Sequence, residues 1–279
     1  MLQIILILFG TLAVLIVLYL LAIMPKVSNR PDLTPFKGRY YAHRGLHQSK
    51  KVSPENSMAA FKLAVEQNYG IELDVQLTKD KVPVIFHDYN LQRICGMDLK
   101  VCDLTYKELE AYTLYKSPER IPTLKSVLDM VNGKVPLIVE FKSGNSDISV
   151  CKESVKLLDY YKGVYCIESF NPLILMWYKR NRPTIVRGQL SSNLIKDEEK
   201  GHPVLLFILQ NLMLNFLTKP DFVAYNHKYT DMLSFNICRV FYKIPTFAWT
   251  IRSNEDLEFN KKYFDYFIFD KFIPTIEIK

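Results

Sequence analysis

Hydrophobic residues in the first two dozen positions form one almost unbroken apolar run. The run extends from Leu2 to Met24, Gln3 is its most polar member, and Pro25 follows it. It is longer than the apolar core of a secretory signal, and no basic residue precedes it. About 20 apolar residues are enough for a helix to cross the hydrocarbon core of a bilayer. We therefore expect residues 1–25 to form a transmembrane anchor.

After a polar linker at residues 26–38, short apolar runs alternate with segments of helical periodicity. The pairs Ser53-Pro54 and Asn171-Pro172 each place a capping residue before a first-turn proline. The expected strands are Tyr40–His43, Gly70–Val75, Pro136–Phe141, Val164–Glu168, Thr184–Gln189, Phe222–Tyr225, Thr246–Ile251 and Tyr266–Phe269. Alternating strands and helices indicate parallel β/α units, and eight such units close a barrel. The fold expected for residues 39–279 is a (β/α)8 TIM barrel.

A further strand-like run, Val82–Phe86, follows Val75 too closely for a parallel crossover, which needs a dozen or more residues. It must return antiparallel, as a hairpin that turns near residues 79–81. This hairpin carries His87 back towards the carboxyl-terminal mouth of the barrel. Residues 89–121 are then expected to form an insertion beside that mouth.

Composition and charge exclude several classes of function. The net charge is +7, but basic and acidic residues are interspersed. Without a basic stripe that carries aromatic residues, no nucleic-acid partner is expected. The odd count of five cysteines, without close pairs, argues against a disulfide framework and a zinc site. Free buried thiols are therefore expected, with a small loop closed by Cys95 and Cys102 as the alternative.

Acidic residues mark the ends of two expected strands. Glu72 and Asp74 alternate with apolar residues, so they share one face of their strand, and Glu140 and Lys142 repeat the pattern. Both faces of a parallel barrel strand are covered, so a charged face is costly unless it opens at the mouth. Two carboxylates about 5 Å apart repel by roughly 3 kcal/mol at an effective dielectric constant near 20. The cluster therefore calls for a cation, and all-oxygen ligands suit Ca²⁺ or Mg²⁺.

Two histidines are expected beside these carboxylates. His43 ends the first strand, Arg44 follows it, and His87 returns on the hairpin. Each histidine alone is more often structural. Together, at the mouth and beside an arginine that can grip phosphate, they suit a general acid and base.

The motifs around these residues resemble the glycerophosphodiester phosphodiesterase family. In chain order they are Ala42-His-Arg-Gly45, Pro54-Glu-Asn-Ser57, Glu72-Leu-Asp-Val-Gln-Leu-Thr78, Phe86-His-Asp88, Ile121-Pro-Thr-Leu124 and Glu140-Phe-Lys142. The resemblance runs from Tyr40 to Asp270. It implies His43 and His87 as the acid–base pair. It also implies one divalent cation, Ca²⁺ or Mg²⁺.

The same resemblance implies roles for eight further side chains. The implied metal ligands are Glu72, Asp74 and Glu140. The implied phosphate or substrate contacts and supporting residues are Arg44, Lys142, Trp249, Glu55 and Asn56. Core packing is the alternative for Trp249. Arg252 departs from the family, which often has asparagine there, and this departure leaves substrate choice open.

The activity implied by the resemblance is hydrolysis of glycerophosphodiesters to glycerol 3-phosphate and an alcohol. A lysophospholipase D acting on lysolipids would use the same machinery. Phosphoinositide-cleaving phospholipase C fits less well, because its bacterial form lacks the acidic cluster. A metal-dependent amidohydrolase would need a His-x-His pair, which is absent. The alternative outside enzymes is an inactive membrane scaffold or a lipid-binding module.

Flanking charge predicts how the anchor is oriented. The basic residues Lys26, Arg30, Lys37 and Arg39 follow the apolar run, against the single acid Asp32. The positive-inside rule then predicts a cell-membrane protein with a cytoplasmic barrel.

A second apolar segment, residues 203–217, lies between the fifth and sixth strands. Apolar residues surround most of its helical axis, interrupted by Gln210, Asn211 and Asn215. It is too short to span a bilayer. We expect it to pack under other elements, with contact to the bilayer interface as the alternative.

Overall fold

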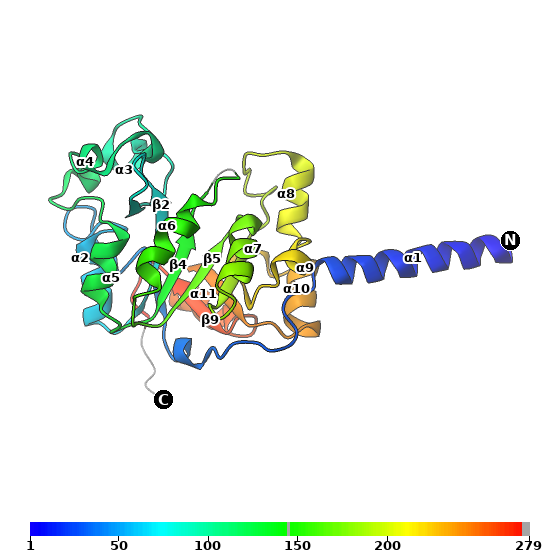
Figure 1. The fold of residues 1–279 in the computed structure, drawn as a ribbon. Coiled ribbons are helices and arrows are strands. Elements are labelled where there is room, and N and C mark those ends of the chain that lie inside the picture. Colours follow the sequence, from blue (N-terminus) through cyan, green and yellow to red (C-terminus); the bar gives the residue numbers. More distant parts are fainter. Residues whose placement is uncertain (144–145, 275–279) are drawn as a thin grey trace.

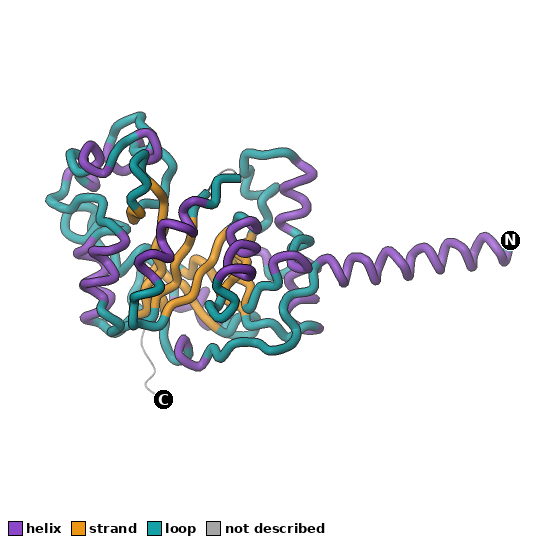
Figure 2. The backbone as a smooth tube through the Cα atoms, viewed as in Figure 1, coloured by secondary structure: helices purple, strands orange, loops and turns teal. Residues whose placement is uncertain are grey.

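The structure, a computed structural model that describes residues 1–143 and 146–274, confirms the TIM barrel. Each of the eight barrel strands is parallel to the barrel strands on either side of it, and pairing of the first with the second closes the ring. The barrel strands are β1 (Tyr41–His43), β2 (Gly70–Leu77), β4 (Leu137–Phe141), β5 (Tyr165–Ser169), β6 (Arg187–Ser191), β7 (Phe222–Asn226), β8 (Thr246–Ile251) and β9 (Tyr266–Phe269). Figure 2 shows them in orange at the centre of the molecule. The expected end of the barrel domain, residue 279, lies outside the described residues.

The expected hairpin is also present. Strand β3 (Pro83–Ile85) pairs antiparallel with the end of β2, and Val75 lies opposite Ile85. Strand β1 ends at His43, opposite Glu72, so the edge of β2 beyond that point is free to pair with β3. The hairpin therefore extends β2 past the barrel mouth and delivers His87 there.

The insertion after the hairpin forms a small lobe with its own core, seen above α2 and α5 in Figure 1. Its short helical segments are α3 (Gln92–Cys95), η2 (Val101–Asp103), α4 (Tyr106–Leu109) and η3 (Leu114–Lys116). Cys95 and Cys102 are free thiols, as are the other three cysteines, so no disulfide closes this lobe.

Helices surround the barrel (Figure 1). They are α2 (Met58–Glu66), α5 (Leu124–Val131), α6 (Ser149–Leu158), α7 (Pro172–Asn181), α8 (Pro203–Gln210), α9 (Asn215–Thr218), η4 (His227–Tyr229), α10 (Leu233–Asn236), the π-helical η5 (Ile237–Phe241) and α11 (Asn254–Asn260). Asn171 caps α7 as expected, accepting a hydrogen bond from the Leu173 amide. The expected cap at Ser53 is wrong, because Ser57 caps α2. Asn56, between Pro54 and that helix, has a φ of 55°, which is not a helical conformation.

Helix α1 (Leu2–Ala22) projects alone from one side of the barrel (Figure 1). The mean hydropathy of its most apolar stretch is 3.1, and no residue of that stretch is buried in the protein. By length and composition it could cross a membrane.

The segment expected to be a linker packs against the barrel. It contains η1 (Thr34–Phe36), and the side chains of Leu33 and Phe36 join the cluster that fills the barrel interior. The Tyr41 hydroxyl donates a hydrogen bond to the Phe36 carbonyl at 2.8 Å. Residues 33–36 therefore close the end of the barrel opposite the mouth.

The expectation that the apolar segment 203–217 packs under other elements holds for only part of it. It forms α8 and α9, separated by a turn, and Val204, Leu205 and Phe207 are each about half exposed. Gln210, one of its polar residues, is buried.

Candidate active site

Three buried carboxylates lie together at the mouth of the barrel. Asp74 of β2 and Glu140 of β4 are partners in the parallel register, and Glu72 lies two residues before Asp74 on the same face. The three side chains each bring one oxygen within 4.8 Å of the others. This geometry brings together the three predicted metal ligands and could hold a cation.

The electrostatics of the cluster favour a bound positive charge. Burial, together with Asp74, Glu140 and Glu168, raises the pKa of Glu72 well above its usual range. Burial also raises the pKa of Glu140, with Lys142 opposing the shift. Oxygen ligands of this kind fit Ca²⁺ or Mg²⁺. A cation here would stabilise the ionised forms that burial disfavours.

Lys142 partly neutralises the carboxylates. Its ammonium lies 2.8 Å from Glu140 Oε1 and 3.1 Å from Asp74 Oδ1. Burial alone would raise the pKa of Asp74, but Lys142, His87 and Arg44 hold it well below its usual range. Glu72 instead accepts a hydrogen bond from the Arg44 backbone amide at 2.9 Å. Lys142 therefore contacts two of the three carboxylates.

His43, at the end of β1, is oriented by Asp270. Its Nδ1 lies 3.4 Å from Asp270 Oδ2, and its Nε2 lies 4.0 Å from Glu72 Oε2. Burial, with help from Arg44, lowers the pKa of His43 to about 4. The ring is therefore neutral near pH 7. If Nδ1 carries the proton towards Asp270, Nε2 is free to accept one.

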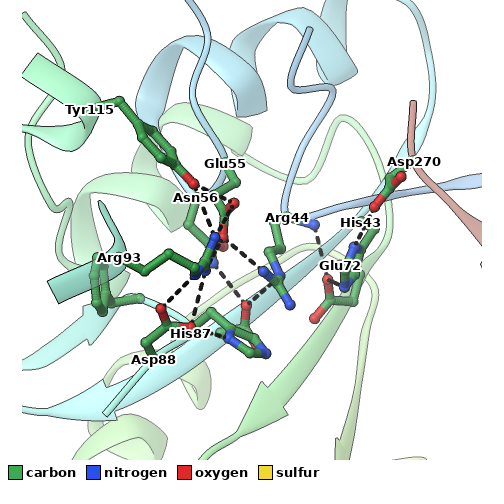
Figure 3. Close-up of polar contacts among 12 residues, drawn as sticks. His43, Arg44, Glu55, Asn56, Glu72, His87, Asp88, Arg93, Tyr115 and Asp270 are labelled. Atoms are coloured by element: carbon green, nitrogen blue, oxygen red, sulfur yellow. Dashed lines mark hydrogen bonds and ion pairs between the residues drawn. The ribbon is translucent and has the colours of Figure 1, made fainter. Parts of the chain in front are cut away.

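His87, which follows β3, has a partner of its own. Its Nδ1 lies 2.6 Å from Asp88 Oδ1, and Arg93 of the insertion holds the other oxygen of Asp88 at 2.7 Å. Figure 3 shows His43 and His87 on opposite sides of the Arg44 side chain. The hairpin and the first strand thus bring both histidines to one site.

Arg44, Glu55 and Asn56 form a polar bridge beside the carboxylates (Figure 3). Arg44 lies 2.7 Å from Glu55 Oε1, and its Nε lies 3.4 Å from Asp74 Oδ2. The side chain of Asn56 donates a hydrogen bond to Asp74 Oδ2, and its backbone N–H donates one to the Arg44 carbonyl. Arg93 also pairs with Glu55. Burial opposes ionisation, yet Arg93 and Arg44 lower the pKa of Glu55 to about 2.

Trp249 lies within β8, next to Asn226 of β7 in the parallel register. Its ring packs edge-on against Phe170, with the centroids 5.7 Å apart. Its buried indole N–H has no hydrogen-bond partner among the described residues. Arg252, the departure from the family pattern, lies 3.4 Å from Asp270. Arg252 therefore borders the site through Asp270.

A cavity of about 640 Å³ lies beside these groups, and its lining includes Glu55, Arg93, Tyr115 and Asp270. His47 and Lys271 contribute to the same wall. The cavity thus borders the site on the side of Glu55 and Asp270, and neither His43 nor His87 is among its lining residues. A slightly larger cavity, lined by residues such as Asp32, Lys37 and Lys261, includes none of the residues of this site.

Reasoning from sequence missed several members of this site. They are Asp88, Arg93, Tyr115, Glu168 and Asp270. Glu168 of β5 lies opposite Glu140 in the register, and burial raises its pKa well above the usual range. Its place in an otherwise apolar strand, level with Glu140, was a usable signal. The contacts of Arg93 and Tyr115 depend on how the insertion folds, which the residue pattern does not specify.

Comparisons with known proteins indicate the family of this chain. The model of the glycerophosphoryl diester phosphodiesterase family matches residues 43–271. A glycerophosphodiester phosphodiesterase of Caldanaerobacter subterraneus is 31% identical over 230 residues, covering 78% of this chain and 87% of that protein. A lysophospholipase D of Rattus norvegicus is 29% identical over 215 residues, covering 72% of this chain and 61% of that protein.

Solved structures share the fold. An Oleispira antarctica phosphodiesterase, solved in complex with the product sn-glycerol-3-phosphate, superposes with a TM-score of 0.65 at 24% identity, covering 83% of this chain and 92% of its own. A glycerophosphodiester phosphodiesterase from Thermotoga maritima gives a TM-score of 0.61 at 24% identity, covering 83% of this chain and 94% of its own. Because the family model spans most of the chain and the fold agrees, this protein belongs to the glycerophosphoryl diester phosphodiesterase family.

Proposed function

We propose that this protein hydrolyses glycerophosphodiesters to glycerol 3-phosphate and an alcohol, with His43 and His87 as the acid–base pair. The observation that carries the proposal is the buried trio Glu72, Asp74 and Glu140 at the barrel mouth, with both histidines beside it. Membership of the family supports the reaction class.

Glu72, Asp74 and Glu140 would hold one divalent cation, Ca²⁺ or Mg²⁺. When bound, that cation would supply Lewis-acid stabilisation of charge on the phosphate oxygens. Lys142, already 3.1 Å from Asp74, would limit the net negative charge of the cluster. Glu55 and Asn56 would hold Arg44 and Asp74 in place through the contacts described above.

The residues of this chain suggest a two-step route. Neutral His43 takes the proton of the glycerol hydroxyl next to the phosphodiester, so that this oxygen attacks phosphorus. His87, oriented by Asp88, gives a proton to the departing alcohol as its P–O bond breaks. Arg44 binds the phosphate oxygens. Water then opens the cyclic phosphate, with the histidines in exchanged roles, and glycerol 3-phosphate leaves. Trp249 would pack against the glycerol, as the resemblance to the family implies.

Product identification tests this proposal. The purified full-length chain would be given glycerophosphocholine, glycerophosphoethanolamine and lysophosphatidylcholine with either cation, and the products would be identified by mass. We expect glycerol 3-phosphate together with choline or ethanolamine. Release of phosphocholine, or no turnover of any diester, would contradict the proposal.

Lysolipid hydrolysis is the second candidate function. The rat relative is named a lysophospholipase D, and α8 presents exposed apolar side chains on one side of the barrel. In the panel above, lysophosphatidic acid and choline from lysophosphatidylcholine would identify this activity. A substrate preference for lysolipids over glycerophosphocholine would favour it.

We further propose that residues 1–25 anchor the protein in the cell membrane with the barrel in the cytoplasm. Helix α1 supports the anchor by its length and hydropathy. The basic residues after the helix support the orientation. Residues 26–38 would connect the anchor to the barrel domain.

A further inference from the structure

The carboxyl end of α1 is fixed to the barrel by specific contacts. Asn215 of α9 donates a hydrogen bond to the Ile23 carbonyl at 3.1 Å, and the Tyr242 hydroxyl donates one to the Leu20 carbonyl at 2.8 Å. The side chain of Ile23 is fully buried in the main core. The apolar helix therefore leaves the barrel at a set position, beside α9 and η5.

Around this exit point the usual distribution of polar and apolar residues is inverted. In α8 and α9, the polar residues Gln210 and Asn215 are buried at 7% and 1% exposure. The side-chain oxygen of Gln210 accepts a hydrogen bond from the Ile195 backbone amide, and its backbone carbonyl accepts one from the Tyr225 hydroxyl. Phe207 and Phe216 of the same helices are exposed at 52% and 43%. Gln210 and Asn215 each make a side-chain hydrogen bond inside the protein, while large apolar side chains face outward.

The neighbouring helices continue this surface. Leu233 of α10 and Val240 and Phe241 of η5 are exposed at 64%, 60% and 66%. The Phe241 ring packs edge-on against Tyr242, the residue that binds Leu20 of α1. We define the apolar collar as the exposed residues Val204, Leu205, Phe207, Phe216, Leu217, Leu233, Val240 and Phe241. Exposed apolar residues gathered on neighbouring helices in this way indicate an interaction site.

We propose that the apolar collar docks into the interface of the same bilayer that α1 enters. Its continuity with α1 identifies the occupant as lipid. Figure 1 shows α8, α9 and α10 stacked along the side from which α1 emerges, with α8 crosswise to α1. A spanning helix lies close to the bilayer normal. The membrane surface then runs along α8, and the collar dips into it.

This arrangement sets the direction in which the active site opens. The carboxyl ends of the barrel strands point along α8 rather than along α1 (Figure 1). The mouth therefore opens parallel to the membrane surface rather than directly towards it.

Spin labels on the full-length protein test the proposal. The background is Cys95→Ser with Cys102→Ser, which removes the two cysteines that are not buried. Single cysteines replace Phe207 or Phe241, and the matched control replaces Tyr160, which follows α6 and is exposed at 80%. Each labelled protein is reconstituted in vesicles of phosphatidylcholine and phosphatidylglycerol. Collisions with oxygen, which concentrates in lipid, are compared with collisions with a water-soluble nickel complex.

We expect the Phe207 and Phe241 positions to favour oxygen and the Tyr160 position to favour nickel. Nickel accessibility at both collar positions equal to that at Tyr160 would overturn the proposal. Dipolar broadening in singly labelled protein would also overturn it, because it would show that a second copy of the chain covers the collar. Neither result depends on catalytic activity.

Discussion

At the residue scale, the acidic site was the most predictable part of the molecule. Glu72, Asp74 and Glu140 stood out because charge is costly on a parallel barrel strand, and the structure brings all three together. Asp270 was not predictable in the same way. Its contact with His43 depends on closure of the barrel between β9 and β1, which joins residues far apart in the sequence.

The raised pKa of Glu72 leads to a prediction about stability. In the folded state Glu72 keeps its proton at pH values where the carboxyl of the unfolded chain has lost it. The folded state therefore loses stability as pH rises through the folded-state pKa of Glu72. Glu72→Gln should therefore raise the melting temperature of the metal-stripped protein near pH 7. The lowered pKa of His43 makes stability depend on pH only between about pH 4 and the ordinary histidine pKa near 6.5. It therefore does not affect a comparison of melting temperatures near pH 7.

The same variant tests cation binding without an activity assay. A ligand at about 100 times its dissociation constant stabilises the folded state by roughly 2.7 kcal/mol. We expect Ca²⁺ or Mg²⁺ to raise the melting temperature of the native protein but much less that of Glu72→Gln. Glu110→Gln, a substitution at an exposed position, is the matched control. Equal cation-induced shifts in all three proteins would exclude Glu72 as a ligand.

Removal of either histidine should affect turnover far more than folding. We expect His43→Ala and His87→Ala each to lower kcat by about 10² or more, the usual scale for loss of a general acid or base. His202→Ala, at an exposed position outside the site, should leave kcat unchanged. Steady-state kinetics alongside thermal denaturation separates the two effects. Near-normal kcat in a histidine variant would remove that residue from the mechanism.

At the element scale, local spacing predicted more than local composition did. The few residues between Val75 and Val82 were enough to predict the hairpin. Ser53-Pro54 had the composition of a helix start, but the positive φ of Asn56 places the start later, at Ser57. The exposed face of α8 and the packed course of residues 26–38 could not be predicted, because both depend on contacts with distant segments.

Packing of the presumed linker gives a prediction about stability. Phe36 is 2% exposed and joins the core at the closed end of the barrel. Phe36→Ala should therefore lower the free energy of unfolding by about 3–5 kcal/mol, the usual cost of a large cavity. Phe259→Ala, at an exposed position, serves as control. Denaturant unfolding in detergent would measure both, and equal small losses would show that residues 33–36 are a free linker.

At the scale of the whole molecule, one apolar helix and one closed barrel meet at a fixed junction. Lys26 pairs with Asp221 at 3.1 Å, and Arg30 donates to the carbonyls of Tyr242 and Lys243. Lys26 and Arg30, two of the basic residues from which the orientation of the anchor was predicted, thus also bind the barrel. The sequence predicted both parts, but the junction depends on how they pack.

Orientation can be measured with a cysteine that is already present. Cys102 is an exposed thiol on the insertion. If the barrel lies in the cytoplasm, a membrane-impermeant maleimide should label Cys102 only after the cells are opened. Cys102→Ser provides the background signal. Labelling of Cys102 in intact cells would place the barrel outside.

The most direct test of the central claim is hydrolysis of glycerophosphocholine by the full-length protein before and after removal of divalent cations. The account predicts that EDTA abolishes release of glycerol 3-phosphate and that added Ca²⁺ or Mg²⁺ restores it, because Glu72, Asp74 and Glu140 would hold the cation beside His43 and His87. Undiminished hydrolysis in a fully metal-stripped sample would contradict it.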